Sequence, residues 1–389
     1  MSAYSIGEVK LDLSAEHAAL QEAVRDFAQS AVKPRAADVD RLHQFPAEAI
    51  DAARELDLMG IMVPEEYGGA GLDHLAFTIA IEEIAAACAS TAVIVDVHNS
   101  VAVEPIVLFG TDEQRRAWLP PMASGELLGG FALTEPSSGS DAATLKTSAK
   151  RYGDEYVLNG TKVFITNVGH AGMYTVFART NPDEPRAAGV SCFLVPADTP
   201  GIKVGQVFKK MGLNGSPTGE LVFEDARVPA ANLLHAEGRG FEVAMRALDS
   251  GRIGISGQAL GIARAAVEES IAYTKEREQF GQAISSFQGI QFMLADMATR
   301  VEAARLLAYD AAVRCDRGLP VTRAASMAKL FCTDTAMDVA IDAVQLAGGY
   351  GYVSEYPFER HFRDAKALQI YEGANQIQRV VIARELIRS

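Results

Sequence analysis

The sequence predicts a mainly helical protein with a central β-domain, in the order helices, antiparallel strands, helices. The domains are expected at residues 1–125, 126–235 and 236–389. Apolar residues follow the helical period in the first third and change near residue 126 to short β-rich runs. From about Gly240 the helical period returns and continues to the end. Four long helical segments with short links in this last part are typical of an antiparallel four-helix bundle.

The first third is expected to form a helical domain. Residues 14–32 carry apolar side chains at helical spacing, with Ser14 as the N-cap. Residues 75–110 are Ala-rich and nearly apolar, and a helix that is apolar all round belongs in an interior or an interface. A short helix at 111–126 is expected to stop at Pro120 and Pro121, because proline interrupts helical hydrogen bonding.

The middle third is expected to form a compact antiparallel β-domain. In "DEYVLNGTKVFITN", residues 154–167, the pair Asn159-Gly160 predicts a hairpin between two strands. Short β runs separated by turn residues follow at 173–180, 190–196, 201–208 and 219–229.

The last third is expected to hold four long helices, at 241–278, 287–317, 322–346 and 358–387. Glycine and proline residues interrupt the helical pattern between these segments, at Gly318, Pro320, Gly348, Gly349 and Pro357.

Composition narrows the function classes. The net charge is −14, which disfavours nucleic acid and anionic membrane surfaces as partners. Four cysteines lie far apart, which favours a reducing compartment over a disulfide framework. The start of the chain resembles neither a signal peptide nor a transit peptide, and no uninterrupted apolar run approaches the length of a membrane span. We therefore expect a bacterial cytoplasmic protein, or a mitochondrial matrix protein in a processed form. The histidines lack metal-ligand spacing, so no metal site is predicted, and His98 is expected to be structural.

Several catalytic motifs are missing, which leaves Glu372 as a leading candidate for acid–base chemistry. The sequence has no strand-linked GxGxxG, no phosphate-binding GxxxxGK[ST] and no GxSxG. Glu372 stands in "LQIYEGANQIQ" among apolar and amide residues. Burial there would raise the pKa of the carboxyl group and suit it to removing a weakly acidic carbon-bound proton. Gly373 would let substrate and backbone approach closely. Alternatively, the Glu-Gly pair only ends one helical run before the next.

Six motifs together resemble the acyl-CoA dehydrogenase family, most closely its short-chain (butyryl-CoA) branch. They are "FALTEPSSGSD" at 131–141, "FITN" at 164–167, "LDSGRIGISGQALGIA" at 248–263, "REQFGQAISSFQ" at 277–288, "QLAGGYGY" at 345–352 and "IYEGANQIQR" at 370–379. The resemblance covers nearly the whole chain. It implies the family fold, with a β-barrel-like middle domain, and a homotetramer, a dimer of dimers, with one FAD per subunit.

The resemblance also implies a reaction. Glu372 would remove the Cα proton of an acyl-CoA while a hydride moves from Cβ to flavin N5, giving trans-2-enoyl-CoA in fatty-acid or branched amino-acid breakdown. The backbone N–H of Glu372 and a ribityl hydroxyl of FAD would polarise the thioester carbonyl. Electrons would leave through electron-transferring flavoprotein.

By the same resemblance, three groups of residues contact FAD. Thr166 would bond near flavin N5, and Phe164, where many members have Trp, would cover the ring; without the motif, Phe164 would be interpreted as a core aromatic. Arg277 would reach the pyrophosphate of a neighbouring subunit's FAD. The complete set of FAD contacts is Phe131, Leu133, Thr134, Gly139, Ser140, Phe164, Ile165, Thr166, Arg277, Gln288, Gln345, Leu346, Ala347, Gly348, Gly349, Ala374, Asn375 and Gln376.

Substrate contacts are implied on one helix and two loops. They are Ser140, Asp249, Ser250, Gly251, Arg252 and Gly373. Asp249 and Arg252 stand three residues apart, so both can lie on one helix face, and their simpler role is an intrahelical ion pair. Relatives in the isovaleryl-CoA and long-chain branches carry the base at the position of Gly251, where this chain has no carboxylate.

Three other functions remain open at this point. An acyl-CoA oxidase would pass electrons to oxygen, and such enzymes are usually longer. A flavin monooxygenase of the same fold would tend to lack the catalytic Glu. A non-catalytic helical scaffold or CoA-binding module would be colourless when purified, whereas bound FAD is yellow.

Overall fold

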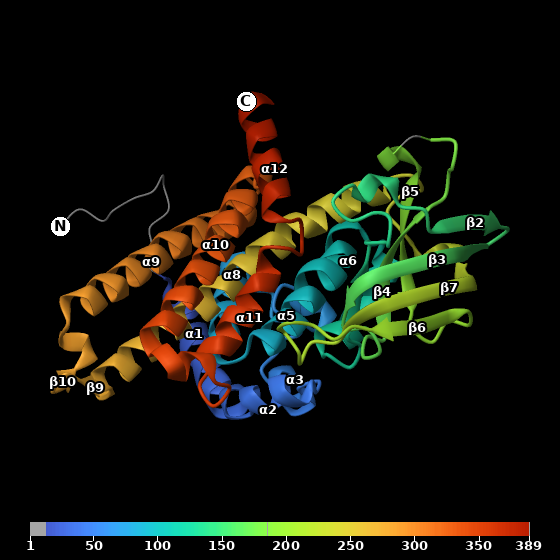
Figure 1. Cartoon of the computed structure of the whole chain (residues 1–389). Coiled ribbons are helices and arrows are strands. Elements are labelled where there is room, and N and C mark those ends of the chain that lie inside the picture. The colour runs from blue at the N-terminus through green and yellow to red at the C-terminus, as the bar shows by residue number, and fades with distance from the viewer. Residues whose placement is uncertain (1–12, 185, 389) are drawn as a thin grey trace.

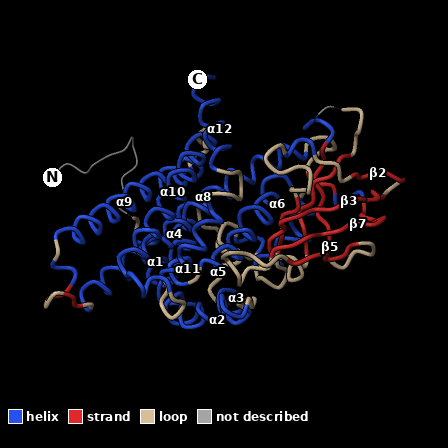
Figure 2. The backbone as a smooth tube through the Cα atoms, in the orientation of Figure 1, coloured by secondary structure: helices blue, strands red, loops and turns tan. Residues whose placement is uncertain are grey.

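The computed structural model describes residues 13–184 and 186–388, in the predicted order of helices, sheet and helices. Figure 1 shows the large sheet at one end of the molecule and the long C-terminal helices reaching to the other. Figure 2 shows the strands of this sheet together at that end, and the short strand pair at residues 278–283 at the opposite end. The N-terminal helices are α1 (Ala15–Phe27), α2 (Ala36–Leu42), α3 (Ala47–Arg54), α4 (His74–Ala87), α5 (Ala89–Val97), α6 (Glu104–Phe109) and α7 (Asp112–Ala123).

The apolar N-terminal segment lies in the interior, as predicted. Every residue of α5 is buried, and so is the π-helical segment His98–Val103 (η4) that follows it. The stretch Ala89–Phe109 is long and apolar enough to span a membrane, but 83% of its most apolar window is buried inside the protein. We therefore interpret this stretch as part of the protein core and not as a membrane span. Ser14 caps α1 by accepting a hydrogen bond from the His17 N–H, also as predicted.

The predicted stop at Pro120 and Pro121 is wrong, because α7 continues through both to Ala123. Both prolines lie in the final turn, where only two N–H donors are lost. Ser124 N–H still donates to the Pro120 carbonyl and closes the helix end.

The middle domain is one eight-stranded sheet in the order β6-β7-β3-β2-β4-β5-β8, with β1 beside β4. Most pairs are antiparallel, but β1 and β2 each pair with β4 in parallel. The strands are β1 (Gly129–Ala132), β2 (Ser148–Tyr152), β3 (Glu155–Thr166), β4 (Met173–Arg179), β5 (Val190–Pro196), β6 (Ile202–Val207), β7 (Thr218–Pro229) and β8 (Leu233–Leu234).

The predicted hairpin at Asn159-Gly160 is wrong, since β3 runs straight through this pair. The register of β3 against β7 shifts between Leu158 and Gly160, which identifies a β-bulge. Asn159 exchanges two hydrogen bonds with Asp225 across the bulge. The turn lies earlier, between β2 and β3, where Gly153 has a φ of 62°.

The C-terminal domain is helical, but the fourth predicted helix is two helices. The elements are α8 (Gly240–Glu276), α9 (Gln288–Asp316), α10 (Thr322–Ala347), α11 (Phe358–Leu368) and α12 (Asn375–Arg388), with the short strands β9 (Glu278–Gln279) and β10 (Gln282–Ala283). The break between α11 and α12 holds Glu372, which has a left-handed φ of 50° that a helix does not allow.

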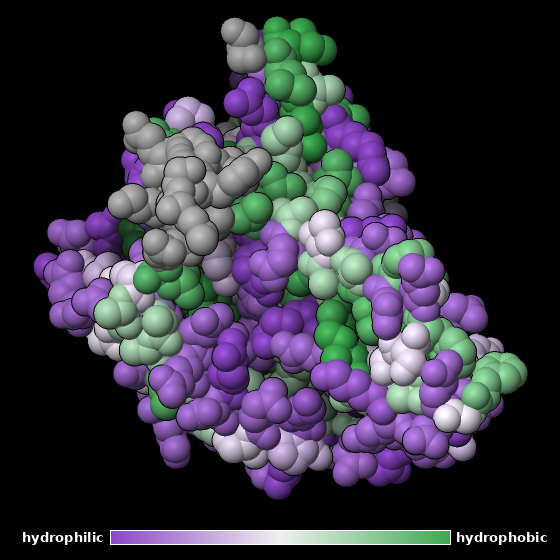
Figure 3. All heavy atoms as spheres, turned by 90° about the vertical axis from the view of Figure 1, so that its left-hand side faces the viewer, coloured by the Kyte–Doolittle hydropathy of each residue, from purple (hydrophilic) through white to green (hydrophobic). Residues whose placement is uncertain are grey.

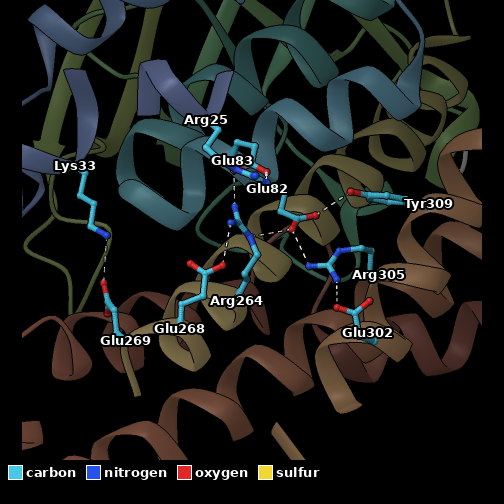
Figure 4. A network of polar contacts seen from close by, with 10 residues as sticks. All are labelled: Arg25, Lys33, Glu82, Glu83, Arg264, Glu268, Glu269, Glu302, Arg305 and Tyr309. Atoms are coloured by element: carbon cyan, nitrogen blue, oxygen red, sulfur yellow. Dashed lines mark hydrogen bonds and ion pairs between the residues drawn. The ribbon is translucent and has the colours of Figure 1, made fainter. Parts of the chain in front are cut away.

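A buried ion network ties the two helical domains together (Figure 4). Glu82 on α4 is 1% exposed. It forms ion pairs with Arg264 of α8 and Arg305 of α9, and it accepts a hydrogen bond from the Tyr309 hydroxyl. Its neighbour Glu83 pairs with Arg264 at 2.7 Å and with Arg25 of α1 at 2.8 Å. Removing one partner of such a buried cluster typically costs about 3–5 kcal/mol. The network therefore fixes α8, which carries part of the site, against α4.

Candidate active site

The turn between α11 and α12 presents Glu372 on unusual backbone. Glu372 and Gly373 both have positive φ, at 50° and 89°. Lys329 Nζ donates to the Gly373 carbonyl at 2.9 Å, and Gln378 Nε2 donates to the same oxygen at 2.8 Å. The carbonyl groups of this turn are thus held, while the N–H groups of Glu372, Gly373 and Ala374 donate no hydrogen bond within the part of the chain that the structure describes.

The Glu372 carboxyl group points at helix α8. A Cβ added at Gly251 would lie 2.2 Å from Glu372 Oε2, so only glycine leaves room for the carboxylate there. Oε2 is buried and has no hydrogen-bond partner among residues 13–184 and 186–388. Burial raises the pKa of Glu372 to about 7, against the opposing effect of the positive charges of Arg252 and Lys329. The arrangement provides a base that is available near neutral pH.

The neighbouring face of α8 carries the other predicted substrate residues. Arg252 Nη1 donates to Asp249 Oδ1 at 2.8 Å, and Thr322 donates to Asp249 Oδ2 at 2.7 Å. The ion pair predicted as the simpler role therefore exists, with both side chains buried. Ser250 is also buried, and its hydroxyl is without a partner in the described residues. Substrate contact by these residues stays a prediction.

A second group of predicted residues lies at the edge of the β-domain. The register of β3 shifts again between Lys162 and Ile165, and Phe164 in this bulge has a φ of 59°. Phe164 is 66% exposed, and its ring lies against that of Phe208, at 5.2 Å between centroids. It is therefore not the core aromatic that the alternative interpretation favoured. The Val163 N–H donates to the Thr134 carbonyl, which brings the 131–140 loop beside this bulge.

This surface fits an aromatic cofactor such as a flavin. The hydroxyls of Thr134, Ser140 and Thr166 form no hydrogen bond with any described residue, so they can serve a ligand. A Cβ at Gly139 would meet nothing within 4 Å, which leaves the loop open. A large exposed aromatic ring held by a β-bulge supplies a flat apolar contact. FAD contacts by Phe131, Leu133 and Ile165 are not tested by these observations.

Residues that the sequence analysis missed hold this loop. Glu135 accepts from the backbone N–H groups of Lys146 and Thr147 and from Lys162 Nζ at 2.8 Å. Lys162 is fully buried, and burial lowers the pKa of its ammonium group to about 8. The motif around Glu135 hinted at a functional loop, but nothing in the sequence indicated Lys162 as the partner.

A third group gathers at the opposite end of α8. Arg277 is exposed, forms no ion pair among the described residues and lies 5.6 Å above the Tyr350 ring. The Ile284 N–H donates to the Arg277 carbonyl, just ahead of Gln288, and Tyr350 follows Gln345–Gly349. Arg277 stands 25 residues beyond Arg252, which is about 37 Å along the helix. This group therefore cannot act at the same place as Glu372 of its own subunit.

Of the residues that follow Glu372, one has a structural role and another has a side chain that is available to a ligand. Asn375 is 3% exposed, and its amide bonds Lys329, Thr333 and Asp334, so the side chain is already fully used. Gln376 is exposed, and its side chain has no partner in the described residues. Lys329 was missed by the sequence analysis. It is fully buried in α10, burial lowers its pKa to about 7, and no motif distinguishes it.

A cavity of about 530 Å³ lies elsewhere, between α2, α3 and the loop after β3. Its lining includes His43, Phe45, Arg54 and His170. None of the predicted site residues lines it. The candidate site is therefore defined by side-chain geometry and not by this cavity.

A carboxyl group with a buried Oε2 and a pKa near neutral, in the same chain as an exposed aromatic surface that fits a flavin, is typical of a flavoprotein oxidoreductase that removes a proton from carbon. The chain belongs to the acyl-CoA dehydrogenase family, whose cofactor is FAD. The N-terminal, middle and C-terminal domains of that family match residues 14–126, 130–226 and 238–387.

Similar proteins support this placement over the whole chain. An acyl-CoA dehydrogenase of Bacillus subtilis is 51% identical over 97% of this chain and 99% of its own length. The human mitochondrial short-chain specific acyl-CoA dehydrogenase is 48% identical over 97% of this chain and 92% of its own. The butyryl-CoA dehydrogenase structure from Megasphaera elsdenii superimposes with a TM-score of 0.96 at 42% identity, covering 98% of this chain and 100% of that one.

Proposed function

We propose that this protein catalyses the FAD-dependent α,β-dehydrogenation of a short-chain acyl-CoA, straight or branched, to trans-2-enoyl-CoA, with Glu372 as the base. This assignment is supported by the environment of the Glu372 carboxyl group. Its Oε2 atom is buried and has no hydrogen-bond partner among the described residues, and burial raises the pKa of the group to about 7. Its close contact with Gly251 leaves no room for a second base on α8. Bound FAD would accept the hydride from Cβ.

The turn itself supplies the second requirement of the reaction. An acyl Cα–H is a very weak acid, so negative charge that develops on the thioester oxygen must be stabilised. The Glu372 N–H is free to donate to that oxygen, because no described residue accepts from it. Lys329 and Gln378 hold the carbonyls of the turn and so orient this N–H. Base and oxyanion donor thus come from one residue.

Preference for short acyl groups is supported by the relatives, several of which are named short-chain specific. The measurement is the rate of flavin bleaching with acyl-CoA substrates of four to sixteen carbons, including isobutyryl-CoA and 2-methylbutyryl-CoA. Fastest bleaching at four to six carbons is expected. A preference for long chains would overturn the branch assignment.

A homotetramer with FAD sites shared between subunits is part of this proposal. Arg277 and Gln345–Gly349 lie too far from Glu372 to reach the same flavin ring from one subunit, so they would contact the FAD of a neighbour. The connections between the C-terminal helices also expose large apolar side chains, including Phe280 at 93% and Tyr352 at 85%. Figure 3 shows apolar surface at the top of the molecule, where the chain ends. In α12, Val380 is 61% exposed and Ile387 is 85% exposed. Light scattering of the yellow protein tests the subunit number.

Electron-transferring flavoprotein is the proposed acceptor. A chain at 46% identity and a TM-score of 0.96 comes from work on the electron-transferring flavoprotein of Acidaminococcus fermentans. The proposal predicts slow reaction of the reduced flavin with oxygen and fast reaction with this flavoprotein. Fast oxygen consumption would indicate an acyl-CoA oxidase instead. Bacterial and mitochondrial relatives both occur, which agrees with a bacterial cytoplasmic or a mitochondrial matrix protein.

Glu372→Gln tests the base directly. The variant should remain yellow and bind acyl-CoA, and lose at least 10³-fold in the rate of flavin bleaching. Glu385→Gln on α12 is the control, because that carboxylate forms a surface pair with Arg384 away from the site. Turnover retained by Glu372→Gln would show that another group removes the proton.

A further inference from the structure

The end of α5 and the start of η4 carry four polar side chains inside an apolar segment. Three of them form hydrogen bonds with backbone groups. His98 bonds the Met122 carbonyl and the Gly129 N–H, which confirms the predicted structural role. Asn99 bonds Leu58, Ile61 and Val95 backbone groups. Ser100 donates to the Asp96 carbonyl and to Asp96 Oδ1.

Asp96 is the exception among the four. It is fully buried, and its Oδ2 has no hydrogen-bond partner in the described residues. No arginine, lysine or histidine of residues 13–184 or 186–388 forms an ion pair with it. Burial raises the pKa of the Asp96 carboxyl well above its usual range, and the charge of Glu372 raises it further. A buried polar oxygen left unpaired is costly, so Asp96 Oδ2 is open to a hydrogen bond from a bound ligand.

Asp96 faces the same side of α8 as Glu372. A Cβ added at Gly254 would lie 2.1 Å from Asp96 Oδ1, just as one at Gly251 would lie 2.2 Å from Glu372 Oε2. Residues three apart on a helix have Cβ atoms about 5–6 Å apart, so the two carboxyl groups are at most about 10 Å apart. Val93, Val97 and Ala247 pack together beside them, with Tyr371 against this cluster. An acyl group with its Cα at Glu372 therefore has Asp96 within reach of its far end.

We propose that Asp96 selects acyl groups that carry a hydrogen-bond donor on the carbon after Cβ, such as a hydroxyl or an ammonium group. This inference rests on the proposed function and narrows its substrate class. A hydroxyl can donate to Asp96 Oδ2 as carboxylate or accept from it as acid, whereas an ammonium group serves only the carboxylate. A plain alkyl end would leave Oδ2 unpaired.

The test compares flavin bleaching by 4-hydroxybutyryl-CoA, 4-aminobutyryl-CoA and butyryl-CoA under anaerobic conditions, using the yellow protein. At least one of the two donor-bearing substrates should exceed butyryl-CoA in kcat/KM by about tenfold or more, the usual size of a hydrogen bond to a buried charged group. Asp96→Val should reverse this preference by a similar factor. Asp96→Asn, which keeps the shape and a polar group, provides a second variant if the first folds poorly.

Glu104→Gln is the matched control, because Glu104 is another buried carboxylate of the same helical segment and pairs with His74. It should leave the ratio of kcat/KM values unchanged. Equal rates for all three substrates in the wild type, or a donor preference that survives in Asp96→Val, would refute the role of Asp96. Absence of bleaching by every acyl-CoA, butyryl-CoA included, would instead refute the proposed function.

Discussion

Glu372→Gln is expected to stabilise the folded protein at pH 8 while it abolishes turnover. Burial raises the pKa of Glu372 from 4.5 to about 7. At about 1.4 kcal/mol per pH unit, this difference of about 2.5 units means that the ionised carboxylate costs about 3–4 kcal/mol of folding free energy at pH 8. A neutral amide of the same shape removes that cost.

The sign of the pH dependence follows from proton binding. Between pH 4.5 and 7 the folded protein keeps a proton on Glu372 that the unfolded chain has released, so wild-type stability falls as the pH rises through this window. The variant has no such group. Its advantage should therefore be about 3–4 kcal/mol at pH 8 and below about 1 kcal/mol at pH 5.

The assay is urea unfolding of wild type, Glu372→Gln and Glu385→Gln, each loaded with FAD, at both pH values. The surface variant should match the wild type at each pH. A Glu372→Gln protein that is less stable than the wild type at pH 8 would refute the reasoning. So would an equal stability difference at pH 5 and pH 8, because it could not come from ionisation.

Three other outcomes are expected. The kcat/KM for an acyl-CoA should rise with pH to a plateau, with an apparent pKa of about 7 that is absent in Glu372→Gln, because only the carboxylate can accept the proton. Gly251→Ala should keep FAD and lower the bleaching rate by about 10²-fold, since its new Cβ would displace the Glu372 carboxylate; an unchanged rate would contradict that contact. Arg277→Ala should weaken FAD retention in equilibrium dialysis, whereas Arg317→Ala, another exposed arginine, should not; equal retention by both would remove the case for a shared site.

The order of the domains could be predicted because periodicity reports it directly. Some predictions of individual elements were wrong, because the sequence pattern on which they rested has a different structural role in this protein. Asn159-Gly160 has the composition of a hairpin turn, but in β3 it forms a bulge that Asp225 pairs across. The helical pattern of 358–387 continues on both sides of the turn, so the Glu372-Gly373 pair was the one sign of a break there, and it was interpreted as an alternative to a catalytic role. Backbone dihedrals cannot be inferred from such spacing.

The candidate site was predictable only in part, for a related reason. Motifs indicated Glu372, Phe164 and Arg277, but motifs do not identify partners that come from distant helices. Lys329 is 43 residues before Glu372 in the chain, yet it bonds the turn through Gly373. Asp96 is still further from Glu372 in the sequence, yet its carboxyl group lies against the same face of α8, at Gly254. Close approach of that kind depends on packing, which has no local signature.

The break between α11 and α12 explains why a single residue can act as base and oxyanion donor. In an intact helix the Glu372 N–H would be used by the carbonyl four residues earlier, and the side chain would lie along the helix surface. The left-handed φ of Glu372 ends that pattern and frees the N–H. Such a conformation costs of order 1–3 kcal/mol, and the bonds from Lys329 and Gln378 to the turn carbonyls offset it. Lys329 therefore acts as a positioning residue: its loss should relax the turn and lower kcat more than it raises KM.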